Sequence, residues 1–280
     1  MSSIRKAFHG EITIRPRNGL DISVLREVYS FRELLYSLVL RDIKVRYKQT
    51  VLGVAWVLFK PLFTMAVFTF IFGRLAKFPS DGVPYPVFVM TGLIPWNYFS
   101  GALSASSYSM LTERHLISKI YFPRIISPLA ASVSHAIDVF ISFLLLLVLM
   151  GMYGVFPSTG IVFVPLLFLA AFVAAIGPGL LFSALMVRYR DVGQIVPFLT
   201  QVWMYATPVI YPVAFIPEKY RWLLYLNPVC GVVEGFRACL LPGKSVDMAA
   251  IGASVLVSTV MFIVGFYYYI RVERSFADVI

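Results

Sequence analysis

The sequence predicts an all-α integral membrane protein with six transmembrane helices, an N-terminal amphipathic interface helix and a short re-entrant helical hairpin on the outer side. Of the 280 residues, 59% are hydrophobic and 14% are charged, and the mean hydropathy is +0.82. A soluble domain is about 45–50% apolar and about 25% charged. Six long segments with almost no formal charge follow residue 48. Each can supply the about 20 apolar residues that cross a hydrocarbon core.

The N-terminal part is polar, and an amphipathic helix follows it. We expect residues 1–30 to form a cytoplasmic arm without a cleaved signal peptide, because no apolar stretch opens the chain. From Phe31, apolar residues recur at i, i+3, i+4 and i+7, and basic residues flank them. This pattern predicts an amphipathic helix over 31–48. A soluble surface helix is the alternative, but the span that follows at once favours a helix lying in the membrane interface.

The six spans belong to one transmembrane domain, residues 50–272, followed by a cytoplasmic tail at 273–280. Between Lys48 and Arg74 the only formal charge is Lys60. The last uncharged run has 23 residues, which give a helix of about 34 Å at ~1.5 Å per residue. We place the spans at about 52–73, 87–108, 126–150, 161–187, 192–212 and 248–270.

The basic residues predict the orientation. With six spans both termini lie on one side, and 17 of the Lys and Arg residues fall on that side against 6 on the other, with Lys60 inside a span. The positive-inside rule therefore places both termini in the cytoplasm. The same rule explains the formal net charge of +10 without a nucleic-acid partner.

The stretch 207–243, between the last two spans, is apolar but too short to cross the membrane twice. Helix signals predict one helix from Pro217 to Leu226 and a second from Asn227-Pro228 to Pro242-Gly243. At about 10 and 14 residues, neither reaches the about 20 that a span needs. We therefore predict a re-entrant hairpin over 213–243 on the outer side. Such backbone is tolerated where protein buries it or a water-filled cavity receives it, which points to a transport pathway.

His135 and Asp138 share one face of the third predicted span. Ionisable residues within a span suggest function. A proton relay in a proton-coupled secondary carrier is one interpretation. A structural hydrogen bond to a neighbouring helix is the other, and we favour it, because one isolated pair is a thin basis for a proton pathway.

The chain offers little for catalysis. Its three histidines are scattered, so we expect no metal site. Pro242-Gly243-Lys244-Ser245 resembles the end of a phosphate-binding loop, but Ala238 stands where that loop needs glycine. We therefore predict a transporter without its own nucleotide-binding site, and not an enzyme. Cys230 and Cys239, about 13 Å apart along one predicted helix, are expected to be free.

Two further stretches suggest function. The charged loop 112–124 predicts a short helix parallel to the membrane, which either docks a cytoplasmic partner or is a plain connection. The second stretch is aromatic and approaches the outer hairpin, where rings could stack on sugars or simply form an interface belt. Its residues are Trp203, Tyr205, Tyr211 and Phe215.

Several motifs together resemble a known family. They are Arg41–Thr50 with Leu52, Gly53, Trp56 and Pro61; Lys119–Arg124; Arg188–Asp191; and Pro208, Tyr211, Pro212, Pro217, Asn227, Pro228, Glu234, Phe236 and Arg237. In combination they resemble the membrane subunit of ABC-2 type exporters that move lipid-linked polysaccharides such as O-antigen, capsular polysaccharide and teichoic acid. The resemblance covers roughly residues 31–272.

The resemblance implies a homodimer in the inner membrane with two copies of a separate subunit that binds ATP and Mg. This chain would bind no cofactor itself. Its partners would be that subunit, membrane lipids and a lipid-linked polysaccharide. An ABC-2 permease for drugs or simple lipids would share the fold and stays an alternative.

The resemblance also assigns residues. Contact with the ATP-binding subunit would fall on Phe31, Arg32, Leu35, Thr112, Glu113, Arg114, His115, Leu116 and Lys119. A basic rim at the cytoplasmic face could attract a lipid pyrophosphate, or could equally be positive-inside anchoring. The rim consists of Arg41, Lys44, Arg46 and Lys48.

Overall fold

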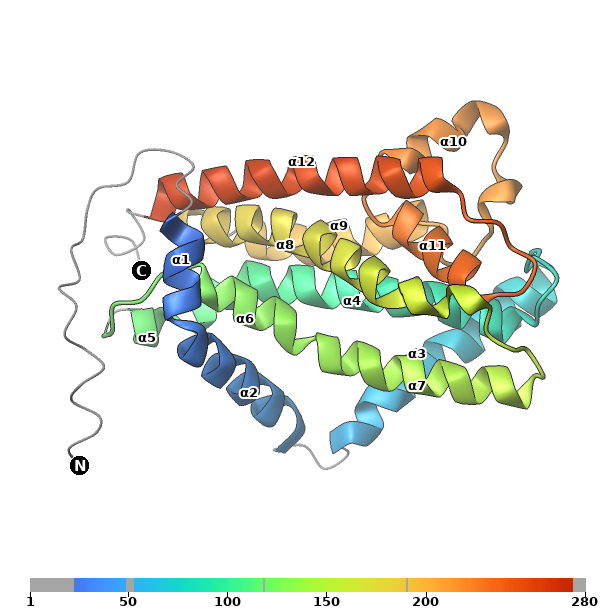
Figure 1. Ribbon diagram of the computed structural model, residues 1–280, viewed down its shortest axis with the longest axis horizontal. Coiled ribbons are helices and arrows are strands. Elements are labelled where there is room, and N and C mark those ends of the chain that lie inside the picture. Colours follow the sequence, from blue (N-terminus) through green and yellow to red (C-terminus); the bar gives the residue numbers. More distant parts are fainter. Residues whose placement is uncertain (1–22, 49–52, 118, 190, 274–280) are drawn as a thin grey trace.

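The computed structural model describes residues 23–48, 53–117, 119–189 and 191–273, and every regular element in these ranges is helical (Figure 1). The predicted all-α class is thus confirmed. The predicted N-terminal arm (1–30) and C-terminal tail (273–280) lie mostly outside the described residues. Both ends of the described chain lie at the same end of the bundle.

The N-terminal helices lie at an angle to the bundle (Figure 1). Helix α1 (Ser23–Ser30) begins within the stretch expected to be an arm, because Val24 is buried against Met110 and Tyr269. Helix α2 (Arg32–Lys48) coincides with the helix predicted over 31–48. Its Leu38 is buried in a small apolar cluster formed with the start of the third predicted span. The helix therefore rests on the bundle and does not cross it.

The remaining elements follow in order. They are α3 (Gly53–Phe68) with a π-helical extension (Thr69–Leu75), α4 (Tyr85–Thr112), α5 (Arg114–Ile117), α6 (Ile126–Ser134), α7 (Ala136–Met152), a 3-10 turn (Thr159–Phe163), α8 (Val164–Arg188), α9 (Val192–Ala206), a second 3-10 turn (Val213–Phe215), α10 (Glu218–Tyr225), α11 (Cys230–Leu240) and α12 (Met248–Val272).

Four stretches in the described part of the chain are long and apolar enough to cross a membrane: Ala55–Leu75, Ile126–Met152, Thr159–Arg188 and Met248–Val272. They correspond to the first, third, fourth and sixth predicted spans. Helices α10 and α11 together would be a fifth, but they are bent by 104°.

The second and fifth predicted spans coincide with α4 and α9. Helix α4 has 28 residues and is long enough at about 42 Å, but its serines, glycines and prolines lower its hydropathy. Helix α9 has 15 residues and ends at Ala206, earlier than the predicted 212, because Pro208 follows and its neighbour is biased away from helix.

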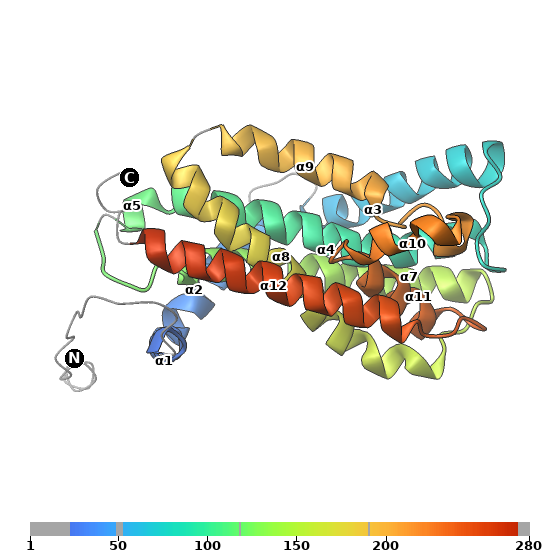
Figure 2. The same cartoon turned by 90° about the horizontal axis from the view of Figure 1, so that it is seen from above.

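Helix α4 is the centre of the bundle. It is buried along most of its length and lies between α6, α7, α8 and α11 (Figures 1 and 2). Its serines satisfy their hydrogen bonds inside the bundle: Ser106 Oγ donates to the Pro128 carbonyl at 2.9 Å. A buried polar group is tolerated when it is bonded in this way.

Helices α8 and α12 cross at two glycines. A Cβ at Gly265 would lie 2.0 Å from the Gly177 carbonyl oxygen, and a Cβ at Gly177 would lie 2.6 Å from the Phe262 nitrogen. Small residues allow helix backbones to approach in this way, which is common in membranes.

The stretch between α9 and α12 contains the two short helices that the sequence predicts. Helix α10 is largely exposed, whereas every residue of α11 is buried against α4, α8 and α12. Both cysteines of α11 are free and buried, as expected from their spacing.

Candidate functional site

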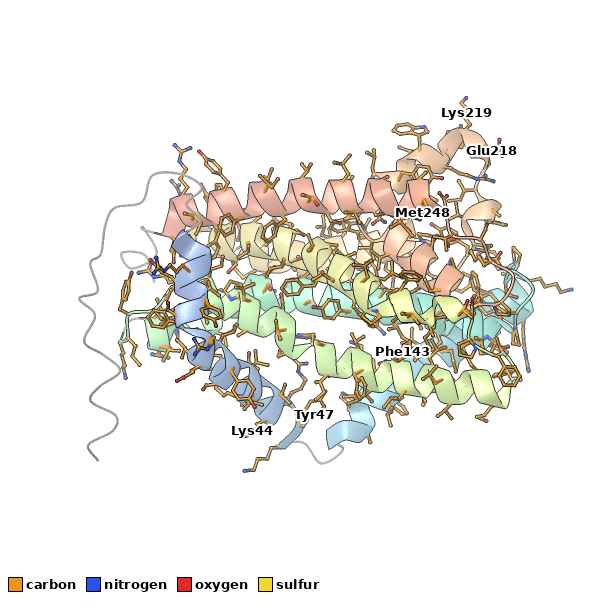
Figure 3. The ribbon with its side chains drawn as sticks, viewed as in Figure 1. Lys44, Tyr47, Phe143, Glu218, Lys219 and Met248 are labelled. Carbon is orange, nitrogen blue, oxygen red and sulfur yellow. The ribbon has the colours of Figure 1, made fainter. Side chains whose placement is uncertain are left out.

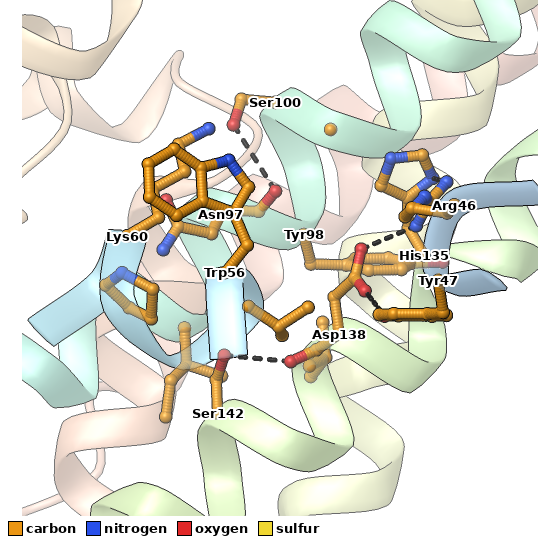
Figure 4. Close-up of a pocket in the computed structure, with 15 residues that line it drawn as sticks. Arg46, Tyr47, Trp56, Lys60, Asn97, Tyr98, Ser100, His135, Asp138 and Ser142 are labelled. Atoms are coloured by element: carbon orange, nitrogen blue, oxygen red, sulfur yellow. Dashed lines mark hydrogen bonds and ion pairs between the residues drawn. The ribbon is translucent and has the colours of Figure 1, made fainter. Parts of the chain in front are cut away.

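A cavity of about 280 Å³ lies between the end of α2, the start of α3, the middle of α4 and the start of α7 (Figure 4). Lys60 and Trp56 of α3 line one side. The other side holds a polar group from α2 and α7, made of Arg46, Tyr47 and Asp138. A second hollow of about 520 Å³ shares Lys60 with the first and continues toward α9.

Asp138 is bonded to the interface helix. Its Oδ2 accepts a hydrogen bond from Arg46 Nη1 at 2.6 Å, and its Oδ1 accepts one from the Tyr47 hydroxyl. Burial, with the Asp138 carboxylate as acceptor, raises the pKa of Tyr47 well above its ordinary value, so the phenol stays protonated and donates. His135 Nδ1 lies 3.0 Å from the Ala131 carbonyl oxygen and 3.3 Å from Arg46 Nη2. Hydrogen bonds between Asp138 and a neighbouring helix are what we expect if His135 and Asp138 have a structural role.

A second ion pair joins the interface helix to the loop after α4. Arg41 Nη1 donates to Glu113 Oε2 at 2.9 Å, and its second terminal nitrogen donates to Oε1. The hydrogen bond to Glu113 is the main reason that the pKa of Arg41 is raised above its ordinary value. Bidentate pairing of this kind fixes orientation as well as distance. Helix α2 is therefore attached to the bundle at two positions about 5 residues apart.

The residues predicted to contact an ATP-binding subunit gather at one end of the molecule. One apolar cluster contains Phe31, which lies between α1 and α2, together with Leu35 of α2 and Leu116 of α5. Glu113 is buried by its pair with Arg41. The others in this group are exposed around that cluster: Arg32, Thr112, Arg114, His115 and Lys119. The structure thus brings the two predicted contact regions together, and the contact itself stays a prediction.

The four basic residues of the predicted rim fall into two classes. Arg41 and Arg46 pair with carboxylates, so their charges are partly compensated. Lys44 is exposed and points away from the bundle (Figure 3), and Lys48 is also exposed. Neither lysine has a carboxylate partner within the described residues. The role of the rim in binding a lipid pyrophosphate remains a prediction.

The aromatic residues near the outer hairpin do not form one cluster. Trp203 Nε1 donates to Asn227 Oδ1 at 3.1 Å, which fixes this ring at the start of the second short helix. The Tyr211 hydroxyl donates to the Tyr205 carbonyl at 3.0 Å. Phe215 packs on Phe78, with ring centroids 5.1 Å apart. Tyr205 and Phe215 are more than half exposed and could meet a ligand; their role also stays a prediction.

A network of connected ion pairs lies around α11, and it was not predicted from the sequence. Arg237 Nη1 donates to Glu234 Oε1 at 2.9 Å, and Glu234 Oε2 lies 2.8 Å from Lys244 Nζ. Lys244 also pairs with Asp81 at 2.7 Å. The i, i+3 spacing of Glu234 and Arg237 was visible in the sequence, but their link to Asp81 depends on the fold.

Comparisons with known proteins agree with the fold. The model of the ABC-2 type transporter family matches residues 33–241. The O-antigen export system permease protein RfbA of Myxococcus xanthus is 30% identical over 243 residues, which cover 86% of this chain and 92% of that protein.

More distant relatives match over a similar length. An O-antigen export system permease protein RfbA of Klebsiella pneumoniae is 27% identical over 249 residues, 89% of this chain and 95% of that protein. The polysialic acid transport protein KpsM of Escherichia coli is 24% identical over 246 residues, 85% of this chain and 93% of that protein. Because the family model spans most of the chain and the relatives match along nearly all of it, the chain belongs to the ABC-2 type transporter family.

Proposed function

We propose that this protein is the membrane-spanning permease subunit of an ATP-driven exporter, which moves a lipid-linked polysaccharide of the O-antigen kind from the cytoplasm across the inner membrane. The observation that carries the proposal is the match, along nearly the whole chain, to permeases named for O-antigen export and polysialic acid transport. A polar glycan cannot cross hydrocarbon without shelter. The cavity between α3, α4 and α7 supports such a path.

We further propose six spans, with α4 and α9 added to the four apolar stretches. Helices α4, α8, α9 and α12 run along one common direction (Figures 1 and 2). The excess of basic residues at the end with both termini supports a cytoplasmic location for that end. Helices α10 and α11 then dip into the membrane from the outer side, where burial of α11 by protein supports a re-entrant path.

Energy would come from a separate ATP-binding subunit, in two copies on a homodimer of this chain. The sequence lacks a complete phosphate-binding loop. Its nearest approach to one, residues 242–245, contains Lys244, whose ammonium contacts Glu234 and Asp81. The exposed residues around Phe31, Leu35 and Leu116 are the docking surface that we assign to the partner.

A proton-coupled carrier is the second candidate, and the geometry argues against it. A relay carboxyl must pass a proton to a neighbouring group, whereas both oxygens of Asp138 are engaged by hydrogen bonds from Arg46 and Tyr47. We expect Asp138→Asn to leave export within about threefold of the wild type, since the amide oxygen can still accept from Arg46 and the amide nitrogen can donate to the Tyr47 hydroxyl. Complete loss of export, with normal amounts of protein in the membrane, would support the carrier.

The substrate class is tested in cells that lack the protein. The proposal predicts that lipid-linked polysaccharide accumulates on the cytoplasmic side and disappears from the surface, and that the wild-type gene reverses both effects. Extraction of the lipid-linked pool measures the first, and surface labelling measures the second. Accumulation of a drug or a simple lipid with normal surface polysaccharide would instead indicate an ABC-2 permease of another substrate class.

A further inference from the structure

We propose that Lys60 is the anion-binding residue of a phosphate site, which holds the diphosphate group of a lipid-linked substrate at the junction of the two hollows. This inference rests on the proposed function and names the place where the charged part of that substrate binds. Lys60 lines both hollows, together with Ser100 and His135 (Figure 4). The two hollows, of about 280 and 520 Å³, have enough volume for a diphosphate and part of the lipid attached to it.

The charges around the cavity favour an anion. Two cations, Arg46 and Lys60, face one carboxylate, Asp138. Asp138 accepts hydrogen bonds from Arg46 and Tyr47, so its charge is satisfied on the far side of the cavity from Lys60. No carboxylate pairs with Lys60 in the described part of the chain. One positive charge is therefore left over, and a bound phosphate would neutralise it.

The place of Lys60 within a span also fits a substrate path. It lies five residues after Ala55, where the first apolar span begins, so it is about 8 Å along the helix. It lines the cavity together with Asn97 and Ser100, which lie midway along α4. A charged side chain inside a span is costly and commonly marks a substrate path.

The residues around Lys60 supply hydrogen-bond donors and an apolar surface beside the cavity. The Asn97 side chain faces the cavity and can donate two hydrogen bonds through its amide nitrogen. The Trp56 ring stacks on Phe59, with centroids 5.3 Å apart, and Phe59 stacks on Phe63. These three exposed rings run along α3 from the cavity into the apolar region, as a polyprenyl chain attached to the phosphate would require.

Binding to the full-length protein in nanodiscs of uncharged phosphatidylcholine tests the proposal. The probes are a polyprenyl diphosphate, the same polyprenol without phosphate, and phosphatidylglycerol as an anionic membrane lipid. Native mass spectrometry measures the occupancy of each. We expect Lys60→Met to weaken binding of the diphosphate about tenfold, as loss of a charge-assisted contact implies, and Lys60→Arg to restore most of it. Polyprenol binding should not change in either variant.

Arg74→Met is the matched control, because Arg74 is an exposed cation at the opposite end of the same span. It should bind all three probes as the wild type does. Unchanged diphosphate binding by Lys60→Met would overturn the proposal. So would an equal loss of polyprenol, or an equal preference for phosphatidylglycerol, which would identify Lys60 as a general contact for anionic lipid. Since binding is read without export, failure of the proposed export function would be seen separately, in cells.

Discussion

Arg237 is fully buried, yet its charge is compensated on several sides. Besides Glu234, its Nη2 donates to the Val209 carbonyl at 2.7 Å and its Nη1 to the Tyr211 carbonyl at 3.3 Å. The guanidinium also lies 3.8 Å from the centre of the Phe88 ring. Taking a charge out of water is expensive and must be offset by such partners. Both terminal nitrogens have them, whereas the buried Nε has no hydrogen-bond partner among the described residues. Arg237 therefore ties α11 to α4 and to the chain between α9 and α10.

Replacing Arg237 with Met should destabilise the protein by about 3–5 kcal/mol, because the Glu234 carboxylate and two carbonyls lose a buried partner. Unfolding of the purified protein in detergent measures the change. Arg221→Met is the control: Arg221 pairs at 3.5 Å with an exposed Glu218, and such a pair contributes less than about 1 kcal/mol. Equal stability of the two variants would contradict this assignment.

At the scale of elements, the interface helix α2 is attached at two points. Arg41 joins it to the loop that precedes α5, and Arg46 joins it to α7. One turn before Arg41, Leu38 anchors it in an apolar cluster with α6. The helix and the loop thus form one connected surface, suited to transmitting movement of a docked subunit to the bundle.

Charge reversal tests this connection. Arg41→Glu places like charges next to each other and should reduce export roughly tenfold, the factor that corresponds to about 1.4 kcal/mol. The double variant Arg41→Glu with Glu113→Arg should recover most of the activity, because the pair is restored in reverse. Surface polysaccharide, normalised to the amount of permease in the membrane, is the measurement. If the double variant exports no more polysaccharide than the single variant, the Arg41–Glu113 pair is not needed for export.

The close crossing of α8 and α12 requires residues without side chains at Gly177 and Gly265. Gly265→Ala would place a methyl group 2.0 Å from the Gly177 carbonyl and force the helices apart, so we expect little folded protein in the membrane. Gly252→Ala on the same helix is the matched control, since nothing lies within 4 Å of its Cβ position. It should be neutral or slightly stabilising. Similar yields of both variants would count against the close crossing.

Elements that depend on local pattern could be predicted from the sequence, and contacts between them could not. The amphipathic helix and four apolar spans follow from periodicity and hydropathy. The pairing of Arg46 with Asp138 brings together residues 92 positions apart, and no local signal announces it. Lys60 stood out as a lone charge in a span, but its cavity exists only because α2, α4 and α7 meet there. Likewise, the partners of Arg237 come from its own helix α11, from α4 and from the stretch between α9 and α10.

At the scale of the whole molecule, the two ends are built for different tasks. One end carries α1, α2 and α5, with exposed basic residues around a small apolar cluster. The other carries α10 and α11, and ion pairs among Arg237, Glu234, Lys244 and Asp81 link α11 to the loops around it. The cavity with Lys60 lies between the two ends, at the middle of α4. This polarity fits a transporter that receives substrate at one face and releases it at the other.

In the function proposed for this permease, transport requires ATP hydrolysis by a separate subunit. The most direct test measures surface polysaccharide in cells that contain this permease together with its ATP-binding partner, disabled only in the hydrolysis step. We expect that export stops and that lipid-linked polysaccharide accumulates inside, while the two subunits still purify together. Undiminished export with the disabled partner would contradict it.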